Sequence, residues 1–358
     1  MNDALTSLAV FSCAALLAAA LAPLAARLGR RWGLVDLPGG RRQHTVPTPR
    51  IGGIALFGSF FSVALVLYLI EFVFQEPAVP DDALRLRGVL LGTAFVFVVG
   101  LIDDRFELGP VPQYAAQFFA ALIAIFHTVF IQEITNPLVG TPQHLPDVVT
   151  FAFTVLWVTG MMNTVNWLDG LDGLAVGVGA IAALLFAIHS YNLARVHEPM
   201  RTNVALFPVA LAGACIGFLP FNFHPARVFL GGAGAMTLGY ALATLSILAP
   251  ARIATALLVM GIPIIDVAWL IVSRWRRGTR PSQGGRDHLH FRLLDRGLSQ
   301  RRIVLLYYGF CAFFGSLALL MPSGLYKLLA LIVMAVLMVA GLAWLSRSGE
   351  NNQTTNGE

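Results

Sequence analysis

Apolar stretches recur from one end of the chain to the other, with short polar connections between them. A helix needs about 20 apolar residues to cross the hydrocarbon core of a bilayer. The pattern predicts about eleven crossings, over residues 4–26, 51–72, 86–102, 112–131, 148–165, 172–192, 203–220, 235–250, 252–273, 302–321 and 325–346. We therefore expect an all-α polytopic membrane protein, with one integral membrane domain over residues 1–346 and a disordered polar tail over residues 347–358.

Composition agrees with this class, because 57% of the residues are hydrophobic and only 12% are charged. Of the 24 basic residues, 6 lie between Arg27 and Arg50, and 9 more lie between Arg274 and Arg302. Under the predicted crossings both loops fall on one face, which the positive-inside rule makes cytoplasmic. The N-terminus is then outside and the C-terminus inside. The net charge of +5 thus reflects topology, and no groove-reading module indicates a nucleic-acid partner.

The most unusual segment is NTVNWLDGLDGLA at residues 163–175, directly after an apolar run. It places four oxygen-bearing side chains at strict three-residue spacing: Asn163, Asn166, Asp169 and Asp172. A regular helix would spread these side chains around its circumference, but Gly170 and Gly173 allow the helix to end and the side chains to converge. Converging oxygens at a membrane surface suit Mg²⁺. The alternative is simple helix capping followed by a turn.

Two further acidic and basic clusters fall on the same predicted face. The loop after the first crossing contains Arg41, Arg42 and His44, which suit a polyanionic ligand or act only as topological anchors. Asp103 and Asp104 lie side by side at the end of the third crossing. Adjacent carboxylates repel unless a cation is near, so a metal site or a catalytic base is expected there. An exposed helix end is the alternative.

The last two clusters lie in the second half of the chain. A glycine-rich segment with Asn222 either cradles phosphate or only allows close helix packing. The long loop near the end contains Arg286, His288 and His290, and its histidines suit metal binding, phosphate charge or proton transfer. Asp266 adds a carboxylate inside a predicted crossing, where it needs a partner.

Together these strings resemble the polyprenyl-phosphate N-acetylhexosamine-1-phosphate transferases of glycosyltransferase family 4, membrane enzymes that start many bacterial cell-envelope glycans. The likeness spans about residues 30–300 and includes RRQHTVPTPRIGG, GLIDDRFEL, NTVNWLDGLDGLA and RDHLHF, in that order. The chain looks closer to the undecaprenyl-phosphate N-acetylglucosaminyl 1-phosphate branch than to the muramoyl-pentapeptide branch, because Arg286 and Asp287 precede a spaced histidine pair.

The resemblance implies transfer of a sugar-1-phosphate, N-acetylglucosamine-1-phosphate in this branch, from a UDP-N-acetylhexosamine to undecaprenyl phosphate, with release of UMP. It implies a Mg²⁺ cofactor, with Mn²⁺ as an alternative, in a multi-pass protein of the bacterial inner membrane whose partners are both substrates and the lipid bilayer. The oligomeric state is left open, with a homodimer as one alternative. The implied catalytic residues are Asp103, Asp104, Asp172, His288 and His290, the metal ligands are Asp169 and Asp172, and the substrate-binding residues are Arg41, Arg42, His44, Asn163, Asn166, Asn222 and Arg286.

Two positions depart from the family pattern. Gly232 stands where family members commonly carry aspartate, and Phe291 stands where the histidine motif continues with another histidine. These departures keep open the alternative of a catalytically silent homologue that acts as a scaffold. An ion-coupled transporter is the other alternative, since buried acids and broken helices also mark substrate pathways.

Overall fold

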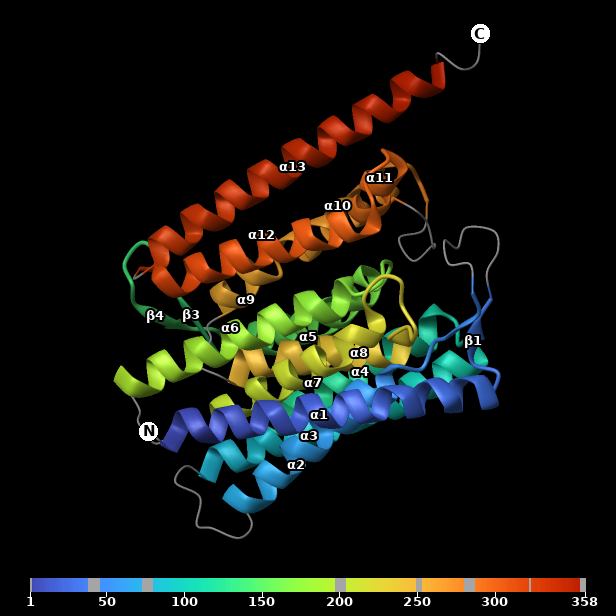
Figure 1. The fold of residues 1–358 in the computed structure, drawn as a ribbon. Coiled ribbons are helices and arrows are strands. Elements are labelled where there is room, and N and C mark those ends of the chain that lie inside the picture. The colour runs from blue at the N-terminus through green and yellow to red at the C-terminus, as the bar shows by residue number, and fades with distance from the viewer. Residues whose placement is uncertain are drawn as a thin grey trace.

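The computed structural model describes residues 2–37, 46–72, 80–196, 204–248, 253–279, 287–321 and 323–354 (Figure 1). Within these ranges the helices are α1 (Asn2–Arg31), α2 (Gly53–Phe72), α3 (Pro80–Phe106), α4 (Pro110–Phe126), α5 (Asp147–Leu168), α6 (Leu174–Val196), α7 (Leu206–Asn222), α8 (Gly231–Leu248), α9 (Ile253–Val259), α10 (Gly261–Arg276), α11 (Leu289–Asp295), α12 (Gln300–Leu320) and α13 (Gly324–Thr354). Two short antiparallel hairpins complete the fold: β1 (Val35–Asp36) with β2 (Thr48–Pro49), and β3 (Glu133–Thr135) with β4 (Pro142–His144).

The expectation of an all-α polytopic membrane protein is confirmed, but the count of about eleven crossings is not. In the described part of the chain, 8 helices are long and apolar enough to cross a membrane, or up to 9 if the bent pair α9 and α10 is one span. Two predicted crossings, α4 and α7, are apolar helices of only 17 residues. The predicted crossing at 252–273 is broken, with a 77° bend between α9 and α10. Pro263 lies in the first turn of α10. Proline has no backbone N–H, and a missing N–H is tolerated in the first turn of a helix.

Close packing of small residues holds the centre of the bundle together. Helix α8 is buried almost along its whole length, whereas α13 is mostly exposed. At the α1–α7 contact, a Cβ added at Gly217 would lie 2.0 Å from the carbonyl oxygen of Ala15. Such backbone approach is how membrane helices gain van der Waals contact without a hydrophobic driving force between them.

The same argument predicts the effect of filling the α2–α8 contact. A Cβ at Gly53 would lie 2.6 Å from the Cα of Gly234, and a backbone atom cannot move aside as a side-chain tip can. Gly53→Ala is therefore expected to destabilise the protein by about 1–3 kcal/mol, seen as a lower thermal midpoint in detergent. Gly160→Ala is the matched control, because no atom lies within 4 Å of its Cβ position. Equal midpoints for both variants would contradict this packing.

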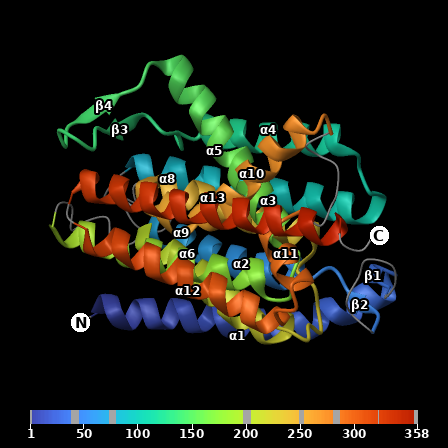
Figure 2. The same ribbon diagram turned by 90° about the horizontal axis from the view of Figure 1, so that it is seen from above.

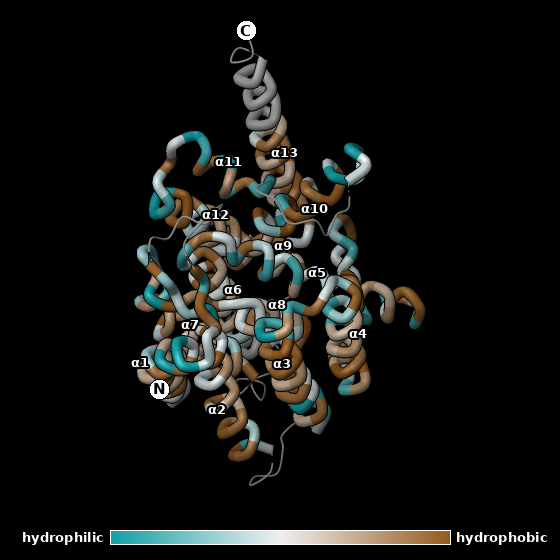
Figure 3. Tube along the Cα trace, turned by 90° about the vertical axis from the view of Figure 1, so that its right-hand side faces the viewer, coloured by the Kyte–Doolittle hydropathy of each residue, from teal (hydrophilic) through white to brown (hydrophobic). Residues whose placement is uncertain are grey.

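The two ends of the bundle differ in character. The β3–β4 hairpin lies at one end, where α1 begins, and β1–β2 lies at the opposite end, toward which α13 runs (Figures 1 and 2). Figure 3 looks onto this second end and shows hydrophilic segments in the loops that face the viewer. Helix α13 continues to Thr354, although the sequence predicts a disordered tail from residue 347. Helix extension is cooperative, so an apolar helix can continue into a polar segment.

Candidate active site

The Asn/Asp segment lies where α5 ends, at the polar end of the bundle. Helix α5 stops at Leu168, and the backbone N–H of the next residue, Asp169, donates to the carbonyl of Val165. A turn follows, in which Gly173 adopts a φ of +81°, a conformation that favours glycine. The predicted helix end is therefore confirmed, and it frees Asp169 and Asp172 from the helical spacing of the two asparagines. We call the segment Asp169–Gly173 the aspartate corner.

The second acid of the Asp103–Asp104 pair lies against the start of α8. The carboxylate of Asp104 accepts hydrogen bonds from the backbone N–H groups of Gly232 and Ala233, each at 3.1 Å. An anion at a helix N-terminus is favoured by the exposed N–H groups and by the helix dipole. A Cβ on Gly232 would lie 2.8 Å from the carboxylate of Asp104. The glycine that departs from the family pattern thus leaves room for a carboxylate supplied by α3.

The acids of α3 and of the aspartate corner are neighbours, because Asp104 and Asp169 both contact the backbone at the start of α8. The pKa of Asp169 is raised to about 7, first by burial of its carboxyl group and then by the negative charges of Asp172 and Asp104. A hydrogen bond from the backbone of Gly231 opposes the shift. A bound cation would relieve this repulsion. No group of three or more His, Cys, Asp or Glu side chains in the described residues is already arranged around a single point as a metal site.

This raised pKa predicts a pH effect on stability. In the unfolded chain Asp169 has a pKa of about 3.9, so between this value and about 7 the folded protein binds more protons. Stability therefore falls as pH rises through this window and levels off above it. The thermal midpoint in detergent without divalent cations, measured from pH 5 to 8, is expected to fall less steeply for Asp169→Asn. Identical slopes for both proteins would show that Asp169 does not titrate there.

The rest of the aspartate corner is fixed by the segment after α7. One carboxylate oxygen of Asp172 accepts from the ring Nδ1 of His224 at 2.8 Å and from the N–H of Ala226 at 3.0 Å. The buried side chain of Asn222 accepts from the N–H of Gly173 and donates to the carbonyl of Val228. Asn222, predicted to bind substrate, therefore holds the corner in place through the backbone.

Two predicted site residues are directed toward α4. Asp103 accepts from the side-chain amide of Gln113 at 2.8 Å, and Asn163 exchanges two hydrogen bonds with Gln117, at 2.6 and 3.2 Å. These four residues lie between α3, α4 and α5, and Asp103, Gln113 and Gln117 line a small, partly open crevice with otherwise apolar walls. Asn166 is partly buried in the last turn of α5. Asp103 and Asp104 are therefore neighbours in sequence that face different helices.

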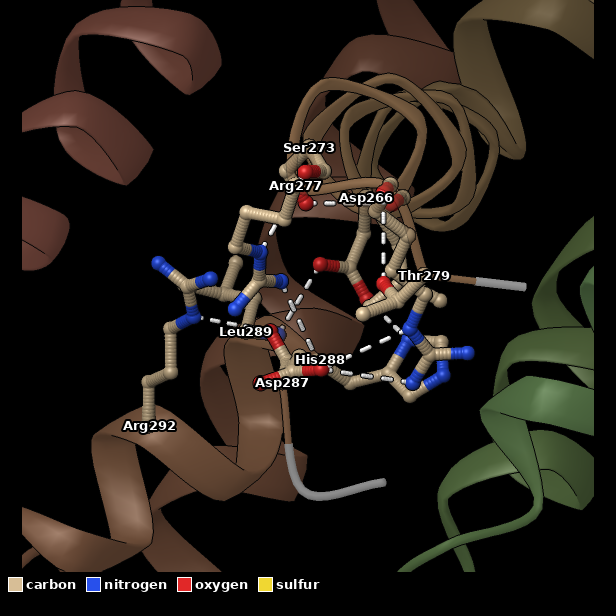
Figure 4. A network of polar contacts seen from close by, with 10 residues as sticks. Asp266, Ser273, Arg277, Thr279, Asp287, His288, Leu289 and Arg292 are labelled. Carbon is tan, nitrogen blue, oxygen red and sulfur yellow. Dashed lines mark hydrogen bonds and ion pairs between the residues drawn. The ribbon is translucent and has the colours of Figure 1, made fainter. Parts of the chain in front are cut away.

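The predicted histidines meet the aspartate corner from the other side. Their rings are stacked, with centroids 5.3 Å apart, and the ring of His288 lies 5.9 Å from that of Trp167 at the end of α5. A Cβ added at Gly170 would lie 2.5 Å from Nε2 of His290. The expected convergence of distant segments at one end of the bundle is thus seen for α3, α5, α8 and α11. Asp266 is bonded to His288 in the polar network of Figure 4.

The two histidines are both buried but differ in their hydrogen bonds. His290 is fully buried, neither of its ring nitrogens has a hydrogen-bond partner among the described residues, and burial lowers its pKa to about 3. It is therefore a neutral imidazole near neutral pH, which can donate or accept a hydrogen bond but cannot offer a positive charge to phosphate. Four other predicted site residues lie outside the described residues: Arg41, Arg42, His44 and Arg286.

Several residues that contact the site are not among the predicted site residues. Arg50 donates to the carbonyl of Asp104 at 2.8 Å, and Tyr308 donates to the carbonyl of Gly173. His224 pairs with Asp172 although it is 52 residues away in sequence. Gln113 and Gln117 of α4 were also not predicted, although two glutamines four residues apart on an apolar helix share one face.

The chain is similar in sequence to proteins of one known family. The sequence model of glycosyl transferase family 4 matches residues 86–250, which include the acidic pair and the aspartate corner. The decaprenyl-phosphate N-acetylglucosaminephosphotransferase of Mycolicibacterium smegmatis is 34% identical over 90% of this chain and 84% of its own length. A probable undecaprenyl-phosphate N-acetylglucosaminyl 1-phosphate transferase of Bacillus subtilis is 28% identical over 80% of this chain and 77% of its own length. A phospho-N-acetylmuramoyl-pentapeptide-transferase of Anoxybacillus flavithermus is 30% identical over 74% of this chain and 81% of its own length.

The Mycolicibacterium relative and this chain are similar over most of this chain rather than over one segment of it. Their similarity reaches both the first half, which contains the acidic pair, and the second half, which contains the histidines. On this evidence the chain belongs to glycosyl transferase family 4.

Proposed function

We propose that this protein transfers N-acetylglucosamine-1-phosphate from UDP-N-acetylglucosamine to a polyprenyl phosphate and releases UMP. The observation that carries the proposal is the convergence of acids and imidazoles from α3, the aspartate corner and α11 at one end of a membrane bundle. One substrate is soluble and the other is a lipid whose phosphate rests at the membrane surface, so only a site at such an end is accessible to both. The names of the relatives support the sugar and the class of acceptor.

The acidic residues fit a magnesium ion. Carboxylate oxygens are the ligands that Mg²⁺ prefers, and it binds one or two of them together with substrate phosphate and water. Asp169 is the preferred ligand because its carboxyl group is already destabilised as an anion by Asp172 and Asp104. Asp172 keeps one carboxylate oxygen that is not bonded to His224 or Ala226. When bound, the cation would neutralise charge on the pyrophosphate, and Mn²⁺ is the alternative ion.

The protein groups would mainly align the two phosphates and spread the developing charge. His288 contacts phosphate oxygens in this proposal, and Asp103 either accepts a proton from the lipid phosphate or attracts the cation. Arg41, Arg42 and Arg286 are proposed to contact the nucleotide. We also propose that the site faces the cytoplasm, with the N-terminus outside and the C-terminus inside, because Arg50 and Arg274, which belong to two arginine-rich segments and contact Asp104 and Asp287, lie at this end. Assembly as a homodimer remains part of the proposal.

The second candidate function is a silent homologue that acts as a scaffold, favoured by Gly232. Against it, Asp104 fills the space beside Gly232 with a carboxylate. Gly232→Asp distinguishes the two. If the protein is a transferase, the wild type releases UMP. If it is a silent homologue, only the Gly232→Asp variant releases UMP.

The proposed function is tested with purified protein in detergent. UDP-N-acetylglucosamine, polyprenyl phosphate and Mg²⁺ together are expected to give UMP and a lipid-linked sugar diphosphate. Omitting the lipid, or removing the cation with a chelator, is expected to abolish the product. A panel of other UDP-sugars defines the donor. Movement of labelled solute into proteoliposomes without UMP release would instead indicate a transporter.

A further inference from the structure

Asp266 is a buried carboxylate that the proposed reaction does not yet use. It lies in α10, the second half of the bent helix pair, and is only 4% exposed. A buried carboxylate is strongly disfavoured unless its oxygens are bonded. One oxygen of Asp266 lies 3.0 Å from Nδ1 of His288, and the other accepts the backbone N–H of Leu289 at 2.9 Å. Asp266 therefore bonds both the ring of His288 and the first residue of α11 (Figure 4).

These contacts fix the protonation pattern of His288. A carboxylate accepts hydrogen bonds, so Nδ1 of His288 must carry the proton that it donates to Asp266. In a neutral imidazole the second nitrogen, Nε2, is then the acceptor, and in the protonated ring it is a second donor. The bond also fixes the plane of the ring, which is only 9% exposed at its side chain.

The stacked partner ring has a different environment. His290 lies against His288 at an interplanar angle of 9°, yet within the described part of the chain neither of its nitrogens has a hydrogen-bond partner. The carboxylate of Asp266 is therefore hydrogen-bonded to His288 and not to His290. His288 is oriented by its hydrogen bond to Asp266 and adjoins Trp167 at the end of α5, whereas His290 packs beside Gly170.

We infer that Asp266 is a positioning residue, which holds His288 in the Nδ1–H form and fixes the start of α11 so that His288 presents Nε2 to the reacting phosphates. The second half of this statement rests on the proposed transferase function, whereas the first half does not. A carboxylate behind a functional imidazole sets its tautomer and orientation, and loss of such a supporting group typically lowers activity by about 10–100-fold.

The tautomer is tested without any turnover. Nitrogen-15 NMR of histidine-labelled protein at pH 8, with the His288 signal assigned by its loss in His288→Gln, reports which ring nitrogen carries the proton. We expect at least about a tenfold excess of the Nδ1–H form in the wild type, and a ratio closer to one in Asp266→Asn. An Nε2–H form in the wild type, or the same ratio in Asp266→Asn, would overturn the inference even if the transferase activity is confirmed.

Kinetics test the link from Asp266 to the reaction. Asp266→Asn is expected to lower kcat about 10–100-fold while the KM for the UDP-sugar stays within about threefold, and Asp266→Glu should recover part of the loss. In the His288→Gln background, Asp266→Asn should have no further effect, because it acts through that ring. If Asp266 had a purely structural role, the fold-losses of Asp266→Asn and His288→Gln would instead multiply in the double variant.

A matched control separates positioning from a general effect of a lost buried acid. Asp82 in α3 is equally buried, at 5% exposure, and lies at the opposite end of that helix from Asp104. Asp82→Asn is expected to keep the wild-type kcat, and a loss as large as that of Asp266→Asn would overturn the inference. If the wild type releases no UMP, the proposed function fails, and the NMR ratio still decides whether Asp266 orients His288.

Discussion

Replacing Asp169 with asparagine is expected to lower UMP release about 1,000-fold or more, the scale on which an active-site metal stabilises charge. Asp169 lies at the end of α5, and burial of its carboxyl group, together with the neighbouring acids, raises its pKa to about 7. Asparagine has the same shape and keeps the turn, but it removes the charge that a cation needs. The measurement is UMP release by the purified variant over a range of Mg²⁺ concentrations.

The matched control is Asp81→Asn, which removes an exposed acid from the first turn of α3, at the other end of the bundle. It should retain wild-type turnover. If Asp169→Asn also retained full turnover at limiting Mg²⁺, the assignment of Asp169 as the metal ligand would be wrong.

Adding a single methyl group at Gly170 is expected to lower turnover about 100-fold, because small misplacements at a reacting centre have effects of this size. Its Cβ would lie 2.5 Å from Nε2 of His290 and 3.0 Å from the ring of Phe291. The backbone of Gly170 is not in the left-handed region, so alanine is not strained by its own conformation. The loss would therefore come from displacing α11 from the aspartate corner.

The control for Gly170→Ala is Gly278→Ala or Gly109→Ala, at positions where nothing lies within 4 Å of the Cβ. Gly109 is preferable, because Gly278 adopts a φ of +69°. Gly109→Ala should keep most of the activity, since the added methyl group meets no neighbour. Wild-type turnover in Gly170→Ala would show that the histidines do not need to approach the aspartate corner.

The fold class could be predicted because long apolar stretches have few stable alternatives in a bilayer. The number of crossings could not, because length and hydropathy do not reveal a bend. The stretch at 252–273 is continuous in hydropathy, yet it breaks between α9 and α10. Similarly, α4 and α7 are apolar but short, and their place in the bundle depends on neighbours that a local pattern does not specify.

The candidate site, like the fold, could be predicted only in part from the sequence. The end of α5 near Gly170 was predictable, because the repeated spacing of Asn and Asp is incompatible with one face of a helix. The different neighbours of Asp103 and Asp104 were harder to predict. Adjacent residues on a helix point about 100° apart, so one carboxylate meets α4 and the other meets α8. The pairing of Asp266 with His288 depends on how α10 packs against α11, which no local pattern shows.

Side-specific cysteine labelling tests the central claim most directly, namely that the acidic and histidine segments share one membrane face. In a background without the three native cysteines, Glu107→Cys and Ser299→Cys report the polar end of the bundle, and Val139→Cys reports the β3–β4 end. We expect an impermeant thiol reagent to label the first two only from the cytoplasmic side and the third only from outside. Labelling of Glu107→Cys and Ser299→Cys from opposite sides would contradict the shared site.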